Sequence, residues 1–256
     1  MSDGVRRALL LVGLLGFAAL FVWGVGGLPP AGEYKGPYGT MLNVSAGAER
    51  HVTDVVTAVN FDYRGADTMG EEFILFTSVL GAAVLLKHEE KKKESGEKEG
   101  TGDDESGEGP PDSEAMRAAA LGLVGLIVTF GLYVVLHGQL TPGGGFQGGV
   151  LLATVPLMVY LAGDPKRFLR IAPEALVETA EAVGAATYVL IGAWALVKGG
   201  VFLQNVLPLG PSEAKVTSGG TIPAINFATG VEVAGGFVLL LTLFLQQMLD
   251  RAREKR

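Results

Sequence analysis

Long blocks of apolar residues alternate with short polar segments along this chain of 256 residues. A helix needs about 20 mainly apolar residues to cross a bilayer, and six blocks meet or approach this length. Buried parallel strands also give apolar runs, but such runs are shorter and bounded by turns. We therefore expect an all-α integral membrane protein with about six transmembrane helices, over residues 8–25, 73–86, 118–136, 150–162, 182–197 and 224–248.

The composition agrees with a membrane protein and limits its chemistry. Hydrophobic residues make up 48% of the chain, and the mean hydropathy is +0.37. The chain has no cysteine, which excludes disulfides, thiolate metal sites and iron–sulfur ligation within it. Any redox chemistry, with iron–sulfur or nickel centres, would therefore belong to partner subunits.

Lysine and arginine near span ends favour the cytoplasmic side. With six spans and the N-terminus inside, only five of the 20 basic residues fall outside or within the membrane: Lys35, Arg50, Arg64, Lys198 and Lys215. This arrangement predicts a multi-pass protein of the cytoplasmic (inner) membrane with both termini in the cytoplasm. Arg6 and Arg7 before the first block could also begin a signal peptide, but no small-residue cleavage site follows, so we expect an uncleaved anchor.

An acidic segment without apolar periodicity divides the chain. From Lys87 to Ala115 it carries eleven acidic residues and five lysines, which account for six of the chain's seven net negative charges. Such a composition predicts a disordered cytoplasmic linker and says nothing about an acidic ligand. We expect a two-span unit over 1–87, a linker over 88–115 and a four-span domain over 116–256.

Glycines at 143, 145 and 148 have the G-x-G-x-x-G spacing of a dinucleotide-binding turn. That fingerprint needs a preceding strand and an acidic residue about 20 positions later. Here a membrane helix precedes the glycines and apolar residues follow them, so no nucleotide is expected. The motif, Pro142, Gly143, Gly144, Gly145, Phe146, Gln147, Gly148 and Gly149, is interpreted as a tight turn between packed helices, with a direct role in ion passage as the alternative.

Two stretches resemble known membrane proteins. The segment TPGGGFQGGV, from Thr141 to Val150, follows a helix ending in His137 and precedes three further spans. It resembles the MrpB component of the Mrp-type multisubunit sodium/proton antiporters, a module that also occurs in membrane-bound hydrogenases and sulfur reductases of archaea. The segment VTAVNFDYRGADTMGEE, from Val56 to Glu72, is similar to the C-terminal part of MrpA, the large component of the antiporters. In hydrogenase-type complexes this C-terminal part is a small, separate protein.

The resemblance covers most of the chain except the linker and the Leu28 to Arg50 loop. It implies an accessory, non-catalytic membrane subunit of a complex that moves Na⁺ and H⁺, with other membrane subunits and the lipid bilayer as partners. The fusion of the two pieces in one chain departs from the commonest antiporter arrangement and favours a redox-driven complex.

The second span needs polar residues to reach full length. Counting back about 20 residues from Lys87 reaches Asp67, which places Asp67, Glu71 and Glu72 in the outer membrane region. Asp62 and Arg64 lie just before them. Ionisable residues at such depth are candidates for an ion path, while Thr68 and Glu71 also match a helix-capping box.

Other ionisable residues extend the set of ion-path candidates. Glu232 lies about eight residues, or roughly 12 Å, into the last block, unless that block begins later and leaves it at the interface. Glu174, Glu178 and Glu181 share one face of the fifth helix; the helix dipole explains the first two, and Glu181 could lead into a channel. Lys198 is expected to extend to the interface or act as a relay base, and His137 to cap a helix or transfer protons.

No nucleophile with a base, no metal-ligand spacing and no basic patch for nucleic acid is present, so we do not expect an enzyme. Two hypotheses remain. The carboxylates line part of a Na⁺ or H⁺ path, or the chain is a structural scaffold without ion contact.

Overall fold

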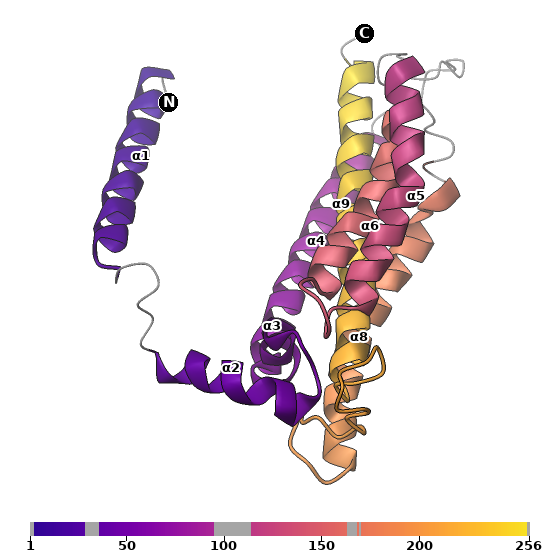
Figure 1. Cartoon of the computed structure of the whole chain (residues 1–256). Helices are drawn as coiled ribbons and strands as arrows, with labels where there is room; N and C mark the ends of the chain where they lie inside the picture. The colour runs from indigo at the N-terminus through magenta and orange to yellow at the C-terminus, as the bar shows by residue number, and fades with distance from the viewer. Residues whose placement is uncertain (1–2, 29–35, 95–113, 163–167, 169, 255–256) are drawn as a thin grey trace. The chain divides into compact units, whose positions relative to one another are not determined.

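The computed structural model describes residues 3–28, 36–94, 114–162, 168 and 170–254, and the regular structure in these ranges is helical (Figure 1). The predicted all-α fold is therefore confirmed. The helices are α1 (Asp3–Gly26), α2 (Pro37–Arg50), α3 (Val55–Ala58), the π-helix η1 (Val59–Tyr63), α4 (Gly65–Glu94), α5 (Glu114–Leu136), α6 (Gly145–Leu161), α8 (Glu174–Val197) and α9 (Ile222–Glu254).

Five of the described helices are long and apolar enough to cross a membrane. They comprise residues Arg7–Gly26, Gly65–Leu86, Arg117–Leu136, Glu174–Val197 and Ile222–Gln247. The remaining predicted span corresponds to α6, which is a shorter apolar helix of 17 residues. The presence of six crossings thus stays a prediction, with α6 at the lower limit of about 17 residues for a span.

The chain forms two compact units, Met1–Met41 and Leu42–Arg256. In the first unit, the spanning part of α1 is 20 residues long and apolar, as expected of a membrane span. The second unit contains both α4, from the predicted two-span part, and α5 to α9, from the predicted four-span part. The two parts of the chain therefore pack together rather than as separate domains.

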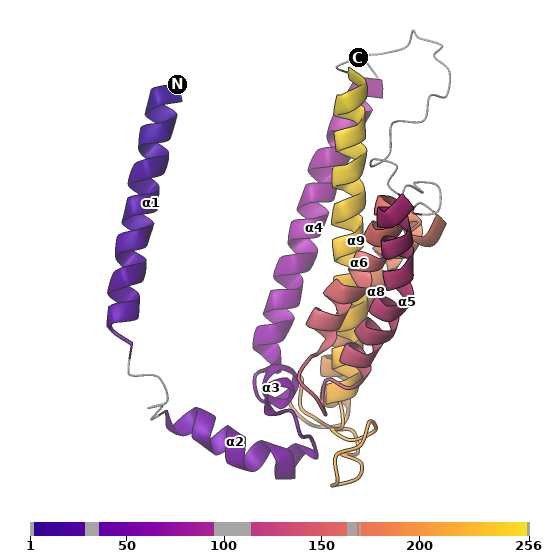
Figure 2. The same cartoon turned by 45° about the horizontal axis from the view of Figure 1, so that its top comes forward.

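Helix α9 lies at the centre of the second unit. It packs against α4, α6 and α8, and Figures 1 and 2 show it running through the bundle between these neighbours. One buried cluster surrounds Phe61, Tyr188 and Ile225 near the start of α9, and another surrounds Val79, Val177 and Leu239 further along it. Side chains on most faces of α9 are consequently buried, as its mainly apolar sequence predicts.

Three local expectations need correction. The expected loop from Leu28 to Arg50 contains α2, which Pro37 begins because proline suits the first helical position; Leu42 and Ala46, one turn apart, are its buried residues. Helix α4 continues to Glu94, into the predicted linker, and residues 95–113 of that linker lie outside the described residues. Helix α4 begins at Gly65, directly after η1, so Thr68 lies within the helix and does not cap it.

The C-terminal end of α9 and the segment 198–221 lie at opposite ends of the bundle (Figure 1). We call the first the C-terminal end and the second the loop end. Helices α4 and α9 both begin at the loop end, whereas α8 begins at the C-terminal end. Expected sidedness would place the loop end outside the cell.

Candidate functional site

Three acidic side chains are buried where α4, α8 and α9 meet. Glu232 of α9 is 0% exposed, Glu72 of α4 is 2% exposed and Glu181 of α8 is 5% exposed. Glu232 lies ten residues after the start of α9, or about 15 Å along the helix. Glu232 is therefore enclosed by protein within α9, which begins two residues earlier than expected, while its depth in the membrane stays a prediction.

The carboxyl groups of Glu72 and Glu232 lie within hydrogen-bonding reach of each other. Glu232 also interacts electrostatically with Glu181, whose carboxyl oxygen Oε1 lies beside Gly236. Four residues separate Glu232 from Gly236, which is about 6 Å along a helix. The three carboxyl groups therefore form a series along α9, from the Glu72–Glu232 pair toward the C-terminal end.

Glycines allow this series to form at the α8–α9 contact. A Cβ atom on Gly184 of α8 would lie 2.6 Å from the Cβ of Glu232, and one on Gly235 would lie 2.7 Å from the backbone nitrogen of Glu181. Both distances are below any real contact between such atoms. The two helices thus approach backbone to backbone at the two levels where the carboxyl groups lie, as small residues permit in membranes.

Within the described part of the chain, no hydrogen-bond donor of normal geometry reaches Oε1 or Oε2 of Glu72 or Glu232, or Oε1 of Glu181. The hydroxyl of Thr229 lies near Glu72, but no regular hydrogen bond joins them. Carboxylate oxygens only accept hydrogen bonds, so two of them in contact inside a membrane require a proton or a cation between them. The arrangement is therefore chemically suited to hold a proton or a cation between the two carboxyl groups.

Tyr188 supports the site from the loop end. Its side chain is 1% exposed, and its hydroxyl donates a hydrogen bond of 2.9 Å to the carbonyl of Gly65, the first residue of α4. Tyr188 also lies close enough to Glu72 to interact with it electrostatically. This contact positions the start of α4 against α8.

A second polar network connects the starts of the two helices that carry the carboxyl pair. Asp62 of η1 lies 2.5 Å from Nε of Arg50 and accepts a hydrogen bond of 2.9 Å from Asn205. Asn205 in turn accepts a hydrogen bond of 2.9 Å from the backbone of Thr221, directly before α9. Asn205 therefore joins the residues that precede α4 to those that precede α9.

Tyr63 extends this network toward the surface. Its ring packs beneath the Arg50 guanidinium at 4.7 Å, and its hydroxyl donates a hydrogen bond of 2.6 Å to Glu49. Burial, together with the hydrogen bond to Glu49, raises the pKa of Tyr63 to about 12. The tyrosine is therefore neutral at any physiological pH and acts as a donor to Glu49.

The glycine-rich turn joins α5 to α6. Gly144 has φ 141°, a backbone conformation that favours glycine. A Cβ atom on Gly145 would overlap the Asn226 carbonyl, and one on Gly149 would lie 2.8 Å from the carbonyl of Gly230. The interpretation as a tight turn that packs a bare face of α6 on α9 therefore agrees with the structure, whereas an ion-passage role for the turn has no contact to support it among the described residues.

Asn226 of α9 holds this turn in place. The side chain is 0% exposed, accepts a hydrogen bond of 2.5 Å from the backbone of Gly145, and donates one of 2.5 Å to the carbonyl of Val135. It thereby satisfies backbone groups at the end of α5 and the start of α6, which would otherwise be costly at membrane depth.

A known family matches most of the second half of the chain. Residues 115–239 match the family described as a domain related to the MnhB subunit of the Na⁺/H⁺ antiporter. This part of the chain is an MnhB-related domain. The predicted resemblance to MrpB of the Mrp-type antiporters is therefore confirmed. The relation of residues 56–72 to MrpA stays a prediction.

Two curated relatives have different coverage. An uncharacterized protein of Methanocaldococcus jannaschii is 29% identical over 230 residues, which cover 80% of this chain and 83% of the relative. A candidate antiporter protein, mnhB2, of Staphylococcus saprophyticus is 43% identical over 47 residues, which cover 18% of this chain and 33% of that protein. The alignment with the first relative thus extends well beyond the MnhB-related domain of this chain.

Solved structures show a similar fold over nearly the whole chain. One is a chain of the membrane-bound sulfane sulfur reductase, an archaeal respiratory membrane complex, with a TM-score of 0.71, 28% identity, and coverage of 94% of this chain and 98% of that one. The other, from the Mrp complex of Dietzia sp. DQ12-45-1b, has a TM-score of 0.68, 21% identity, and coverage of 95% and 26%. Both are chains of membrane complexes, which agrees with the predicted partners, other membrane subunits.

The structure separates the acid–base cluster predicted around the start of α4. Asp67 pairs with Arg64 through Nε at 2.6 Å and through a second guanidinium contact, and both side chains are more than half exposed. Glu71 is also exposed, on the face that it shares with Asp67. Asp62 joins Arg50 and Asn205 instead, so from the predicted cluster only Glu72 contacts the MnhB-related domain at the buried site.

The remaining candidates lie outside the carboxyl series, although Glu178 interacts electrostatically with Glu181. Glu174 and Glu178 are exposed in the first turns of α8, at the C-terminal end of the bundle. His137 stacks on the Tyr133 ring with 4.4 Å between the ring centroids. Lys198 caps α8 and places its amine 5.1 Å from the Trp194 ring, as expected for a side chain that extends to the interface. Within the described ranges, no three His, Asp or Glu side chains of the MnhB-related domain or α4 are grouped so as to hold a metal ion.

Sequence reasoning did not identify Asn226, Asn205 or Tyr188. Asn226 could have been found, because an amide inside an apolar membrane block usually has a defined partner. Asn205 and Tyr188 gave no such signal, since one lies in a loop and tyrosine is common near membrane interfaces.

Proposed function

We propose that the chain is an accessory membrane subunit of a multisubunit, cation- and proton-translocating complex, an Mrp-type antiporter module or a redox-driven reductase or hydrogenase that contains one. The MnhB-related domain and the similarity to a sulfane sulfur reductase chain support this assignment. The chain itself would be non-catalytic, and any iron–sulfur or nickel chemistry would reside on its partners.

Within such a complex, we propose that Glu72, Glu232 and Glu181 form part of the H⁺ or Na⁺ path. The observation that carries this proposal is the burial of three carboxyl groups from three helices along α9, with no hydrogen-bond donor for the Glu72–Glu232 pair among the residues that the structure describes. A scaffold has no use for such groups, since uncompensated carboxyl groups inside a membrane destabilise it. A site that binds and releases a cation requires them.

Transport by inverted membrane vesicles that contain the whole complex tests the proposal. Glu232→Gln, Glu72→Gln and Glu181→Gln keep the side-chain shape and remove the charge, so each is expected to lower Na⁺-dependent proton movement at least about tenfold. Glu71→Gln is the matched control, because Glu71 neighbours Glu72 in sequence but faces outward. Co-purification of the partner subunits checks assembly.

The two hypotheses give opposite results. Loss of transport with intact assembly in the buried variants, and normal transport in Glu71→Gln, supports the ion path. Unchanged transport in all three buried variants would leave the chain as a structural scaffold.

A further inference from the structure

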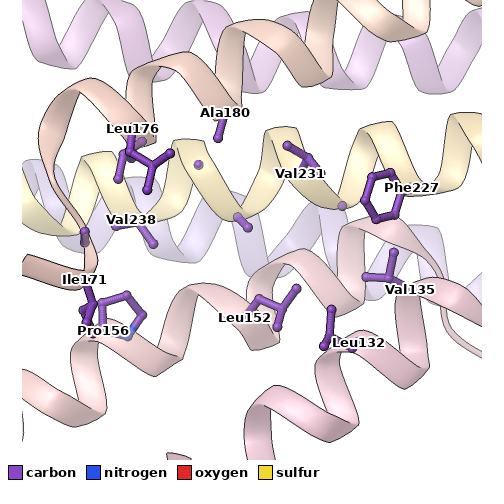
Figure 3. A pocket seen from close by; sticks show the side chains of 15 residues that line it. Leu132, Val135, Leu152, Pro156, Ile171, Leu176, Ala180, Phe227, Val231 and Val238 are labelled. Atoms are coloured by element: carbon purple, nitrogen blue, oxygen red, sulfur yellow. The ribbon is translucent and has the colours of Figure 1, made fainter.

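An apolar cavity of about 300 Å³ lies over one side of α9, between α8 and α6 (Figure 3). Gly230, Ala234 and Gly235 of α9 line it, together with Leu176 and Ala180 of α8 and Leu152 of α6. None of its fifteen lining residues has a polar or charged side chain. The cavity is distinct from the carboxyl series, which lies at the contact of α9 with α4 and α8.

The cavity is open along the surface of the bundle. Leu176, Phe227 and Ile171, which line it, are 59%, 50% and 46% exposed. Its walls are membrane helices, so its opening faces hydrocarbon or a neighbouring subunit. From Phe227 to Val238 it extends over eleven residues of α9, roughly 16 Å, which is about half of the 30 Å hydrocarbon core. This is the thickness of one lipid leaflet.

A basic residue lies at one end of the cavity. Figure 3 shows Ile171 and Pro156 together at the end opposite Phe227, and Arg170 directly precedes Ile171 in the chain. Arg170 is exposed and takes part in none of the ion pairs found among the described residues. Arginine binds phosphate with paired hydrogen bonds, and basic residues between membrane helices bind anionic headgroups.

We propose that this cavity binds one acyl chain of an anionic phospholipid whose phosphate pairs with Arg170. The apolar lining suits the chain, the length suits one leaflet, and the charge of Arg170 is complementary to the headgroup. A helix of a partner subunit fits less well, because a helix about 10 Å across and 16 Å long occupies several times the volume of the cavity.

Photo-crosslinking within the whole complex identifies the occupant. A photoreactive phenylalanine analogue in place of Ala180 is expected to give an adduct with the mass of a phospholipid in the intact mass spectrum. The same analogue in place of Ala119, an exposed residue of α5 outside the cavity, gives the background from surrounding lipid. A crosslink to another polypeptide, or no lipid adduct above this background, would overturn the proposal.

Reconstitution tests the headgroup and the cavity separately. The complex is placed in phosphatidylcholine vesicles that contain phosphatidylglycerol, and the retained lipid is counted by native mass spectrometry. Ala180→Phe is expected to abolish retention. Arg170→Gln is expected to lower retention of phosphatidylglycerol about tenfold. The matched controls are Ala119→Phe and Arg117→Gln, which change exposed residues of α5 in the same way.

Arg170→Gln alters an exposed side chain and leaves the packing intact, so it decides the question even where Ala180→Phe fails to assemble. Equal retention of phosphatidylglycerol by the wild type, Arg170→Gln and Arg117→Gln would contradict the proposed headgroup contact. Phosphatidylcholine retained as strongly as phosphatidylglycerol by the wild type would contradict it as well.

Discussion

The carboxyl groups of Glu72 and Glu232 come within hydrogen-bonding reach of each other from opposite sides of the acidic segment 95–113. Each lies on a different membrane helix, and each is almost completely buried. Neither half of the chain could form this pair alone. The buried site is therefore a joint property of α4 and the MnhB-related domain.

The carboxyl pair is expected to give strongly non-additive effects on stability. Replacing either residue with glutamine supplies an amide donor to the other, so Glu72→Gln or Glu232→Gln alone should maintain or raise the thermal unfolding midpoint of the complex. In the double variant the two amides still bond to each other, so the second replacement adds no further gain, with a coupling energy of about 1 kcal/mol or more. Thermal unfolding of the purified complex measures it. Glu71→Gln combined with Glu232→Gln is the control, since its two shifts in midpoint should simply add. Additive shifts for Glu72→Gln with Glu232→Gln would show that the two buried groups do not interact.

The contact between α8 and α9 should not tolerate a side chain at Gly184. A Cβ atom there would lie 2.5 Å from the backbone nitrogen of Glu232, so Gly184→Ala forces the helices apart and is expected to cost about 1–3 kcal/mol. Gly81→Ala is the control, since nothing lies within 4 Å of its added Cβ, and alanine favours a helix over glycine by about 1 kcal/mol. The yield of assembled complex is measured for both variants. Equal yields for Gly184→Ala and Gly81→Ala would rule out close backbone approach at Gly184.

Asn226 should be essential for the turn between α5 and α6. Asn226→Ala leaves the N–H of Gly145 and the carbonyl of Val135 without their partners, at a cost of about 1–3 kcal/mol for each group. We expect the variant to lower the thermal midpoint by several degrees and to accelerate hydrogen exchange at the turn. Asn43→Ala, at an exposed position of α2, should change neither. Unchanged exchange in Asn226→Ala would mean that the turn is held by packing alone.

Asn205 should restrain the segment 198–221 at the loop end. Its removal frees Asp62 and the backbone N–H of Thr221 from their shared partner, so Asn205→Ala is expected to accelerate tryptic cleavage after the exposed Lys215 several-fold. Thr217→Ala, in the same loop and also exposed, controls for local changes. Cleavage of intact and inverted vesicles shows in addition which side of the membrane the loop end faces. Equal cleavage of Asn205→Ala and Thr217→Ala would contradict a bridging role.

The sequence was sufficient to predict the helical fold and to include Glu72, Glu181 and Glu232 among the candidates, because acidic residues at membrane depth have few physical explanations. It also placed Asp67 and Glu71 on one helix face, as the spacing of four requires. It could not decide which face points inward. Glu72 lies one position further around the helix and is buried, whereas both of its neighbours in the predicted cluster are exposed.

Long-range pairing was not predictable from one sequence. Nothing local to Arg50, Asp62 or Asn205 indicates that they meet, since Asn205 lies 143 positions after Asp62 in the chain. The start of α4 was placed too late because η1 precedes it, and π-helical turns have no reliable sequence signal. Helix α2 was missed since its polar composition resembles that of a loop.

The covalent connection between α4 and the MnhB-related domain has a consequence for biogenesis. Two binding modules on one chain have a high effective concentration toward each other, so the halves of the carboxyl site meet without a separate encounter in the membrane. They are also synthesised in equal numbers by every ribosome that completes the chain. The MnhB-related domain is therefore never made without α4. Glu232 is not left without its partner carboxyl group in a protein that quality control would degrade.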